Sequence, residues 1–337
     1  MPPNDDAVPL YVTDHSSRLG VSAGSLKVTF HKDVKPSVTV PIHQLQSVTI
    51  VGNAQASTQA LHACMDAGLM VHWMTGGGWH LGRAHGDGAA LLDVRRAQFG
   101  HAEGARGHGI ARVLVADKIA NVRTILRRNE DQPDEILTAQ LKELAAKALV
   151  APDRTALLAL EAEAARRSWT AFSRMLEAKD PAFAMAGRTR RPPRDRTNAL
   201  LGFAYGLLVR DCVQAVVGAG LDPYLGVYHV PHGGRPSLAL DLMEPFRPLA
   251  ADSVVLSVVR RGEVDARGFV DTGQAVAMAS HARRALISAY ERRISEEIAH
   301  PLFGYRITYR QVLAVQARLL ARALTGELPT MASFRTR

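Results

Sequence analysis

Two acidic residues and a histidine lie close together in the segment 229–244, and residues of these types can bind a metal ion. His229 stands in a loop rich in glycine and proline, and Asp241 and Glu244 follow it on a short expected helix. Asp241 and Glu244 are three residues apart, so they share a face of that helix. Because like charges repel among apolar neighbours, this acidic pair favours a bridging cation. Pro245 places the Glu244 carboxylate at a helix end, where a ligand can approach.

The same residues allow two other interpretations. Glu244 could pair with Arg247, three residues further on, and leave Asp241 solvated. His229 and His232 form a His-x-x-His pair that could contribute to a zinc hydrolase acting on a small substrate. The zinc interpretation gives no reason for the basic character of the C-terminal part of the chain.

A third carboxylate, Glu161, lies on a helix that is expected to begin after Asp153. Glu161 leans toward the predicted buried stripe of this helix, whereas Glu163 points away and can be solvated. The predicted stripe consists of Leu158, Ala162, Ala165, Trp169, Phe172 and Leu176. Because no Lys or Arg lies three or four residues from Glu161, its charge needs a cation from elsewhere in the chain. Alternatively, the Glu161 side chain extends past the apolar stripe into solvent.

Basic residues are concentrated in the second part of the chain. The 337 residues carry a formal net charge of +9, yet residues 1–100 hold seven basic and seven acidic side chains. Five arginines precede the helix expected over 197–219: Arg188, Arg190, Arg191, Arg194 and Arg196. Guanidinium groups bind phosphates in a bidentate manner, so this segment is a candidate DNA-binding loop. Alternatively, the arginine segment is a solvated linker. The positive net charge of the whole chain could likewise serve only to keep the protein soluble.

The pattern of residues predicts an α+β fold with two domains. Residues 1–100 contain no glutamate and show short β-branched runs, which favours strands. Strands are expected over 10–13, 26–30, 37–40, 48–51, 69–74 and 79–83. One helix among them can begin at Ser57 and end at Gly68. This domain is predicted to be a β-sandwich or β-roll that carries one helix.

Helical periodicity dominates after residue 108, which predicts a larger, all-α C-terminal domain. Helices are expected over 109–128, 133–149, 154–178, 197–219, 237–244, 248–260, 274–298 and 307–325. Ser237 can cap the helix over 237–244. The predicted organisation is an N-terminal domain over 1–90, a linker over 91–108, the helical domain over 109–330 and a loose tail over 331–337.

The sequence also predicts a cytoplasmic protein. Cys64 and Cys212 lie far apart in apolar segments, which is typical of small core residues rather than of a disulfide. The first residues resemble no signal peptide, and no uninterrupted apolar run approaches the ~20 residues that span a bilayer. We therefore expect no membrane association.

Two segments, GLDPYLGVYH at 220–229 and GRPSLALDLMEPFRP at 234–248, closely resemble the CRISPR-associated Cas1 family. Further segments resemble the family in the same order along the chain. They are VGNAQAST at 51–58, LEAEAAR at 160–166, NALL and YGLL at 198–208, and ITYR and QAR at 307–318. The resemblance extends from about residue 10 to residue 329 and looks closest to the type I-C branch.

This resemblance implies a CRISPR spacer-acquisition integrase and DNA endonuclease. It implies an N-terminal domain used in dimer formation and a helical domain with a catalytic Mg²⁺ or Mn²⁺ held by Glu161, His229 and Glu244. Asp241 would support this site or act as an occasional ligand, and Asn198 would help to orient it. The family acts as homodimers bridged by a Cas2 dimer, on double-stranded DNA from a protospacer and a CRISPR repeat. The alternative is a DNA-binding scaffold of the same complex that has lost catalysis.

Overall fold

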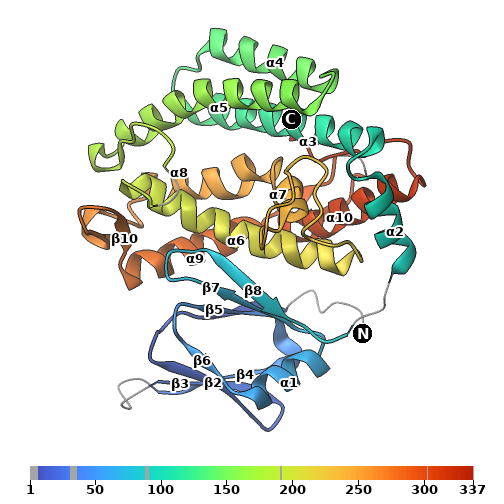
Figure 1. The fold of residues 1–337 in the computed structure, drawn as a ribbon. Coiled ribbons are helices and arrows are strands. Elements are labelled where there is room, and N and C mark those ends of the chain that lie inside the picture. Colours follow the sequence, from blue (N-terminus) through green and yellow to red (C-terminus); the bar gives the residue numbers. More distant parts are fainter. Residues whose placement is uncertain (1–6, 31–35, 88–90, 190–191, 302, 337) are drawn as a thin grey trace. The chain divides into compact units, whose positions relative to one another are not determined.

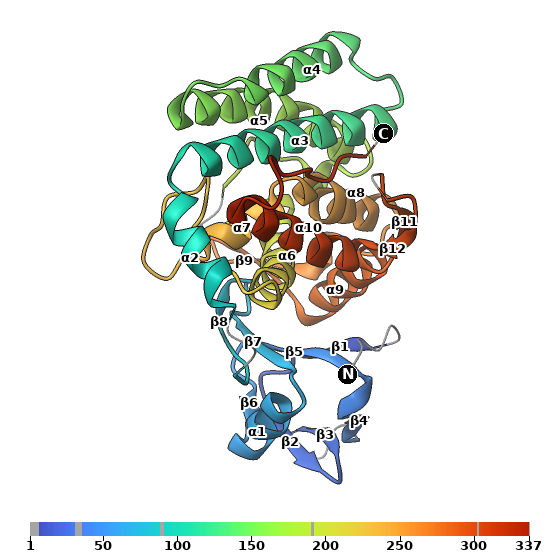
Figure 2. The same cartoon turned by 90° about the vertical axis from the view of Figure 1, so that its right-hand side faces the viewer.

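The computed structural model describes residues 7–30, 36–87, 91–189, 192–301 and 303–336. The chain forms two compact units, residues 1–89 and residues 90–337. Figures 1 and 2 show the strands of the first unit and the helices of the second.

The first unit contains two four-stranded sheets. One has the order β1-β5-β7-β8, in which β1, β5 and β7 are parallel and β8 is antiparallel to β7. Its strands are β1 (Val8–Val12), β5 (Leu45–Val51), β7 (Met70–Met74) and β8 (His80–Ala84). The other has the order β4-β3-β2-β6, with β2 (Ser17–Ser22), β3 (Ser25–Phe30), β4 (Val38–Pro41) and β6 (Gln55–Ala56).

Both sheets and helix α1 (Thr58–Asp66) contribute to one hydrophobic core, which confirms a strand-rich N-terminal part with an α-helix. The helix begins where the Ser57 side chain accepts a hydrogen bond from the Ala60 N–H at 3.2 Å. The core includes Leu19, Leu26, Val48, Ile50, Cys64 and Val71. A 3₁₀ turn, Ile42–Gln44, connects β4 to β5. The structure adds β2 and β6 to the predicted strands.

The second unit is mainly helical, as predicted. Its α-helices are α2 (Leu92–His101), α3 (Ala105–Asn129), α4 (Glu135–Leu149), α5 (Arg154–Glu177), α6 (Arg196–Gly218), α7 (Ser237–Met243), α8 (Ser253–Arg260), α9 (Ser280–Ile294) and α10 (Tyr309–Thr325). Short 3₁₀ turns lie at Pro181–Phe183 (η3) and Ala266–Gly268 (η5). A π-helical turn, Arg247–Asp252 (η4), leads directly into α8, so the helix expected over 248–260 is irregular in its first half.

Two short hairpins correct the all-α prediction for this unit. They are formed by β9 (Phe269–Asp271) with β10 (Val276–Met278) and by β11 (Glu297–Ala299) with β12 (Arg306–Thr308). The helix expected over 274–298 therefore begins later and ends earlier, as α9. Val276 and Met278 are buried while Ala277 is exposed, and this alternation is typical of a strand.

Helix α6 lies at the centre of the unit, and α3, α4 and α5 pack on one another (Figure 1). By length and composition α6 would suffice to cross a membrane, but 67% of its most apolar window is buried inside the helical unit. Such burial is typical of the core helix of a globular domain.

Two segments are more ordered than the sequence predicted. In place of a linker over 91–108, α2 packs against α10, and its Gln98 amide donates to the carbonyl oxygens of Asp222 and Leu225, both at 2.8 Å. The tail expected to be loose is docked, because Phe334 is 1% exposed and its carbonyl accepts a 2.9 Å bond from Asn121. Both segments are held by buried contacts with residues far away in the chain. A local sequence pattern does not reveal such contacts.

Candidate functional site

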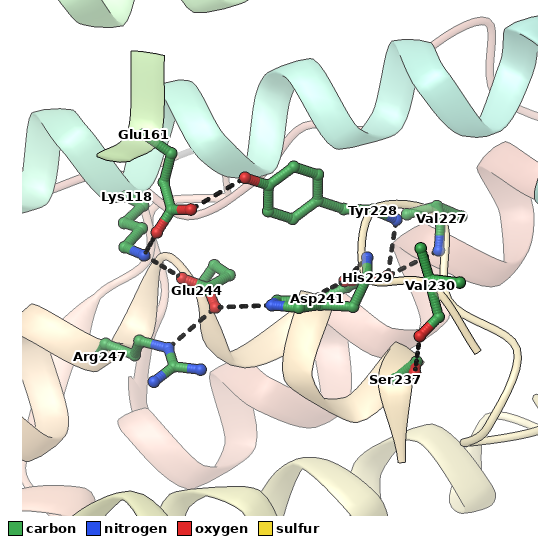
Figure 3. A network of polar contacts seen from close by, with 10 residues as sticks. All are labelled: Lys118, Glu161, Val227, Tyr228, His229, Val230, Ser237, Asp241, Glu244 and Arg247. Atoms are coloured by element: carbon green, nitrogen blue, oxygen red, sulfur yellow. Dashed lines mark hydrogen bonds and ion pairs between the residues drawn. The ribbon is translucent and has the colours of Figure 1, made fainter. Parts of the chain in front are cut away.

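Charged side chains from several elements of the helical unit meet in one network (Figure 3). Helix α3 contributes Lys118, α5 contributes Glu161, and the loop between α6 and α7 contributes His229. Glu244 lies at the C-terminal end of α7, which stops before Pro245 as the sequence predicted. The network thus joins residues that are far apart in the chain.

Lys118 connects the two glutamates. Its ammonium group contacts Glu161 Oε1 in a short ion pair and lies 2.5 Å from Glu244 Oε2. The contact with Oε2 is an ion pair without hydrogen-bond geometry. The Glu161 side chain is 23% exposed and the Glu244 side chain 2%. Lys118 is therefore the cation from elsewhere that Glu161 requires, and Glu161 does not extend freely into solvent.

Two further side chains complete the surroundings of these carboxylates. The Tyr228 hydroxyl donates to Glu161 Oε2 at 3.0 Å, and burial, followed by the Glu161 charge, raises the pKa of Tyr228. Arg247 Nε donates to Glu244 Oε1 at 2.9 Å. Burial disfavours the charged form of Glu244, but Arg247, Lys118 and His229 outweigh it and lower the pKa of Glu244 to about 2. Glu244 is thus a buried, ionised carboxylate.

Asp241 anchors the loop that carries the histidine. It is fully buried, and its carboxylate accepts backbone N–H bonds from Val227, Tyr228 and His229 at 2.6, 3.0 and 2.8 Å. It also contacts His229 Nδ1 at 2.6 Å. The interpretation with a solvated Asp241 is wrong, although the Glu244–Arg247 pair of that interpretation is present. In this structure Asp241 orients the histidine.

The contact with Asp241 determines which face of the imidazole is available. Because Nδ1 is directed at Asp241, Nε2 is left to face Glu244, whose Oε1 lies 3.8 Å away. A carboxylate that holds one imidazole nitrogen while the other faces a charged centre is a common arrangement around protein-bound metals. The histidine is therefore positioned as a ligand would be.

A glycine that the sequence reasoning did not single out permits this arrangement. A Cβ atom at Gly226 would lie 2.6 Å from Asp241 Oδ2 and 2.8 Å from the His229 carbonyl oxygen. Such distances are too short for any side chain, so the backbone can approach Asp241 only with glycine here. Ser237, expected to cap α7, is instead its first residue and donates to the Val230 carbonyl at 3.1 Å.

The chemistry of these groups suits a hard divalent cation. The described residues contain no group of three acidic, histidine or cysteine side chains already placed to hold a metal. In this network the Lys118 ammonium lies between Glu161 and Glu244. A cation is therefore already favoured at this position, and carboxylate oxygens with one imidazole nitrogen are ligands that Mg²⁺ or Mn²⁺ accepts.

The Asn198 side-chain amide forms hydrogen bonds with the segment that precedes α6. Its Oδ1 accepts from Arg188 Nη1 at 2.5 Å and from the Thr189 N–H at 3.0 Å. Its Nδ2 donates to the Gly187 carbonyl at 2.8 Å and to Asp195 Oδ2 at 2.6 Å. Asn198 therefore holds Arg188 in place, and none of these four hydrogen bonds is to Glu161, His229 or Glu244.

The candidate DNA-binding arginines differ in their surroundings. Arg188 lies over the Tyr205 ring at 5.2 Å, and Arg196 donates to the Ala182 carbonyl at 3.0 Å. Arg194 is exposed. Arg190 and Arg191 lie outside the described residues. Arg188 and Arg196 thus belong to the packed protein rather than to a solvated linker.

Two hollows adjoin the network. The first is lined on its polar side by Lys118, Glu161, Arg188, Arg247 and Asp252, and on its apolar side by residues that include Trp169 and Phe172. The second adjoins the histidine and is lined by residues that include His108, Arg154, Gly226, Tyr228 and His229. The network is buried but can be reached from both.

The buried side of α5 differs from the predicted stripe. Leu158 is 41% exposed, whereas the neighbouring Leu157 is buried. Because α5 packs against both α3 and α4, its buried face is turned toward the helix pair. Glu163 pairs with Arg166 and Arg167 at the surface.

His232 is exposed, and the described residues offer no third ligand to complete a zinc site with it and His229.

Sequence reasoning missed Lys118 and Tyr228 as members of the site. Lys118 is a single lysine among Leu114, Val115 and Ile119 on the buried side of α3. A lone charge on an apolar helix face was the available signal. Tyr228 carried no comparable signal, because its role depends on α5.

The sequence matches the model of the family described as CRISPR associated protein Cas1 over residues 10–292. It is 39% identical over 335 residues to a CRISPR-associated exonuclease Cas4/endonuclease Cas1 fusion of Rhodospirillum rubrum, covering 97% of this chain and 57% of the relative. It is 36% identical over 329 residues to CRISPR-associated endonuclease Cas1 3 of Thermus thermophilus, covering 97% of each chain. The chain thus spans little more than half of the fusion protein. These names do not specify the type I-C branch, which stays a prediction.

The fold resembles a solved casposase bound to integration product, with a TM-score of 0.81 and 20% sequence identity. The alignment covers 95% of this chain and 91% of the casposase chain. At this identity the similarity establishes the fold alone.

Proposed function

Because the chain belongs to the CRISPR-associated Cas1 family, we propose that it is a metal-dependent DNA integrase and endonuclease of CRISPR spacer acquisition. The observation that carries this proposal is the network in which Lys118 joins Glu161 to Glu244 beside His229. The Thermus relative, covered almost completely, is named an endonuclease, which supports phosphodiester chemistry.

Glu161, Glu244 and His229 Nε2 would hold one Mg²⁺ or Mn²⁺. When bound, such an ion polarises a phosphoryl oxygen and stabilises the charge that develops during in-line displacement. Asp241 keeps His229 oriented through Nδ1, and Gly226 allows the backbone to approach Asp241. Arg247 holds Glu244 in place through its Nε, and Asn198 would support the site indirectly, through Arg188.

In the proposed reaction, the 3′-hydroxyl oxygen of a captured DNA fragment attacks a phosphorus atom at the border of a CRISPR repeat. The new P–O bond forms as the bond from phosphorus to the 3′ oxygen of the repeat strand breaks, and that oxygen leaves with a proton. No electrons are transferred between the strands. The basic excess after residue 100 supplies an attractive field for DNA, and Arg188, Arg194 and Arg196 are candidate phosphate contacts.

The proposed assembly is a homodimer that binds a Cas2 dimer, and the proposed location is the cytoplasm. In this assembly the strand-rich unit would serve dimer formation and the helical unit catalysis. The alternative hypothesis, a DNA-binding scaffold that has lost catalysis, is disfavoured because all proposed ligand types are present in one buried network.

The test is strand transfer of a short duplex into a plasmid that carries the cognate repeat, with Mn²⁺ and Cas2. We expect Glu161→Gln, His229→Ala and Glu244→Gln each to lower the rate by about 100-fold or more, since each removes a proposed ligand. Glu163→Gln is the matched control, because Glu163 is on the same helix but pairs at the surface. Full activity in any of the three ligand variants would refute the proposal.

A further inference from the structure

One residue at the candidate metal centre has no part in the proposed reaction. The Lys118 side chain is only 15% exposed, and its ammonium lies between the carboxylates of Glu161 and Glu244 (Figure 3). A buried lysine loses solvation and rotamer freedom, so its presence there requires compensation by the two carboxylates.

The two carboxylates that contact Lys118 are already matched by two cations. Two carboxylates, Glu161 and Glu244, face two cations, Lys118 and Arg247. A divalent ion held by the same carboxylates would add two positive charges within a few ångströms of the ammonium. Because such repulsion is strong in a partly buried site, the ammonium and the ion cannot share this position favourably.

The surroundings of Lys118 allow its ammonium group to move away from the two carboxylates. Lys118 lines the first hollow, which Trp169 and Phe172 also line. Its side chain is a flexible four-carbon stem with a compact charge, so Nζ can move while the backbone of α3 stays in place. Arg247 lacks this freedom, since its Nε is bonded to Glu244 and its guanidinium lies over the Tyr205 ring at 4.8 Å.

We propose that Lys118 is an internal counter-cation that a divalent ion displaces from between Glu161 and Glu244, and that it thereby sets the metal affinity of the site. The inference rests on the proposed function in one respect, because it takes Glu161 and Glu244 to be metal ligands. Lys118 acts through these ligands and is a positioning residue. It holds the two carboxylates together until metal is bound.

The test measures Mn²⁺ binding to the full chain by electron paramagnetic resonance titration. Lys118→Met keeps most of the side-chain volume and removes the charge, so we expect Mn²⁺ to bind about tenfold or more tightly, which is about 1.4 kcal/mol. Lys118→Arg keeps the charge and should stay near the wild-type affinity. Lys142→Met, at an exposed position of α4, should also leave the affinity unchanged.

Thermal unfolding provides a second readout. Without metal, Lys118→Met should melt below the wild type, because two buried carboxylates lose their shared cation. Mn²⁺ should raise the melting temperature of the variant more than that of the wild type, as tighter binding requires. If Lys118→Met does not fold, Lys118→Gln replaces it in both measurements.

The outcomes separate this inference from the proposed function. Equal or weaker Mn²⁺ binding by the uncharged Lys118 variants overturns the inference alone, provided that Glu161→Gln and Glu244→Gln abolish binding. If those two variants bind Mn²⁺ as the wild type does, the metal centre of the proposed function fails and the inference fails with it.

Discussion

Replacing Glu244 by glutamine tests whether a buried, ionised carboxylate stabilises the metal-free protein. Glutamine keeps the shape of the side chain but removes the charge that Lys118 and Arg247 face. The pKa of Glu244 is lowered from 4.5 to about 2, which corresponds to about 3 kcal/mol at about 1.4 kcal/mol per pH unit. We therefore expect Glu244→Gln to lower the free energy of unfolding by about 3 kcal/mol at neutral pH.

The pH dependence of this loss has a definite sign. Because the pKa of Glu244 is lower in the folded than in the unfolded chain, its contribution is fully present above about pH 4.5. It is lost as the pH falls toward about 2. The difference between wild type and variant should thus be constant near neutral pH and shrink in acid.

The assay is urea unfolding in the presence of a chelator, followed by far-ultraviolet circular dichroism, which reports on the helical unit. Glu143→Gln is the control, since Glu143 pairs with Lys147 at the exposed surface and should matter little. A Glu244→Gln protein as stable as the wild type, or a stability difference that grows in acid, would show that the ionised Glu244 carboxylate does not stabilise the fold.

Two further predictions concern other parts of the helical unit. Burial raises the pKa of Asp252 from 3.8 to about 6, so its ionisation destabilises the fold, a cost absent below about pH 4 and fully present above about pH 6. The unfolding free energy of Asp252→Asn, measured relative to that of the wild type, should therefore rise by about 3 kcal/mol between about pH 4 and about pH 6. A difference between the two proteins that does not change with pH would contradict this prediction. Phe334→Ala should cost about 3–5 kcal/mol in the same assay, because Phe334 is buried and stacks on Phe246 at 5.5 Å, whereas a loose tail would show no effect.

Most of the secondary structure could be predicted because its signals are local. Ser57, Asp153 and the residues that follow them mark helix starts, and the structure places α1 and α5 there. The strands β6 and β9–β12 were missed, because two or three residues carry too little periodicity. The six-residue strand β2 was missed as well. The tail was predicted wrongly because its anchor, Asn121, is more than 200 residues away.

The sequence singled out the acids and the histidine of the candidate site but not its geometry. Asp241 and Glu244 stood out as neighbouring like charges, yet their different roles depend on the backbone of the loop before α7. Lys118 is 43 residues from Glu161, and only the packing of α3 on α5 brings the two together. Contacts between residues so far apart in the chain produce no regular residue spacing, so a sequence pattern cannot reveal them.

The most direct test of the central claim is a crystal structure of the full chain with Mn²⁺, measured at the manganese absorption edge. We expect one anomalous peak in contact with Glu161, Glu244 and His229 Nε2, and a Lys118 ammonium that has moved away from both carboxylates. A peak bound elsewhere, or no peak at saturating Mn²⁺ with Lys118 still between the glutamates, would contradict this expectation.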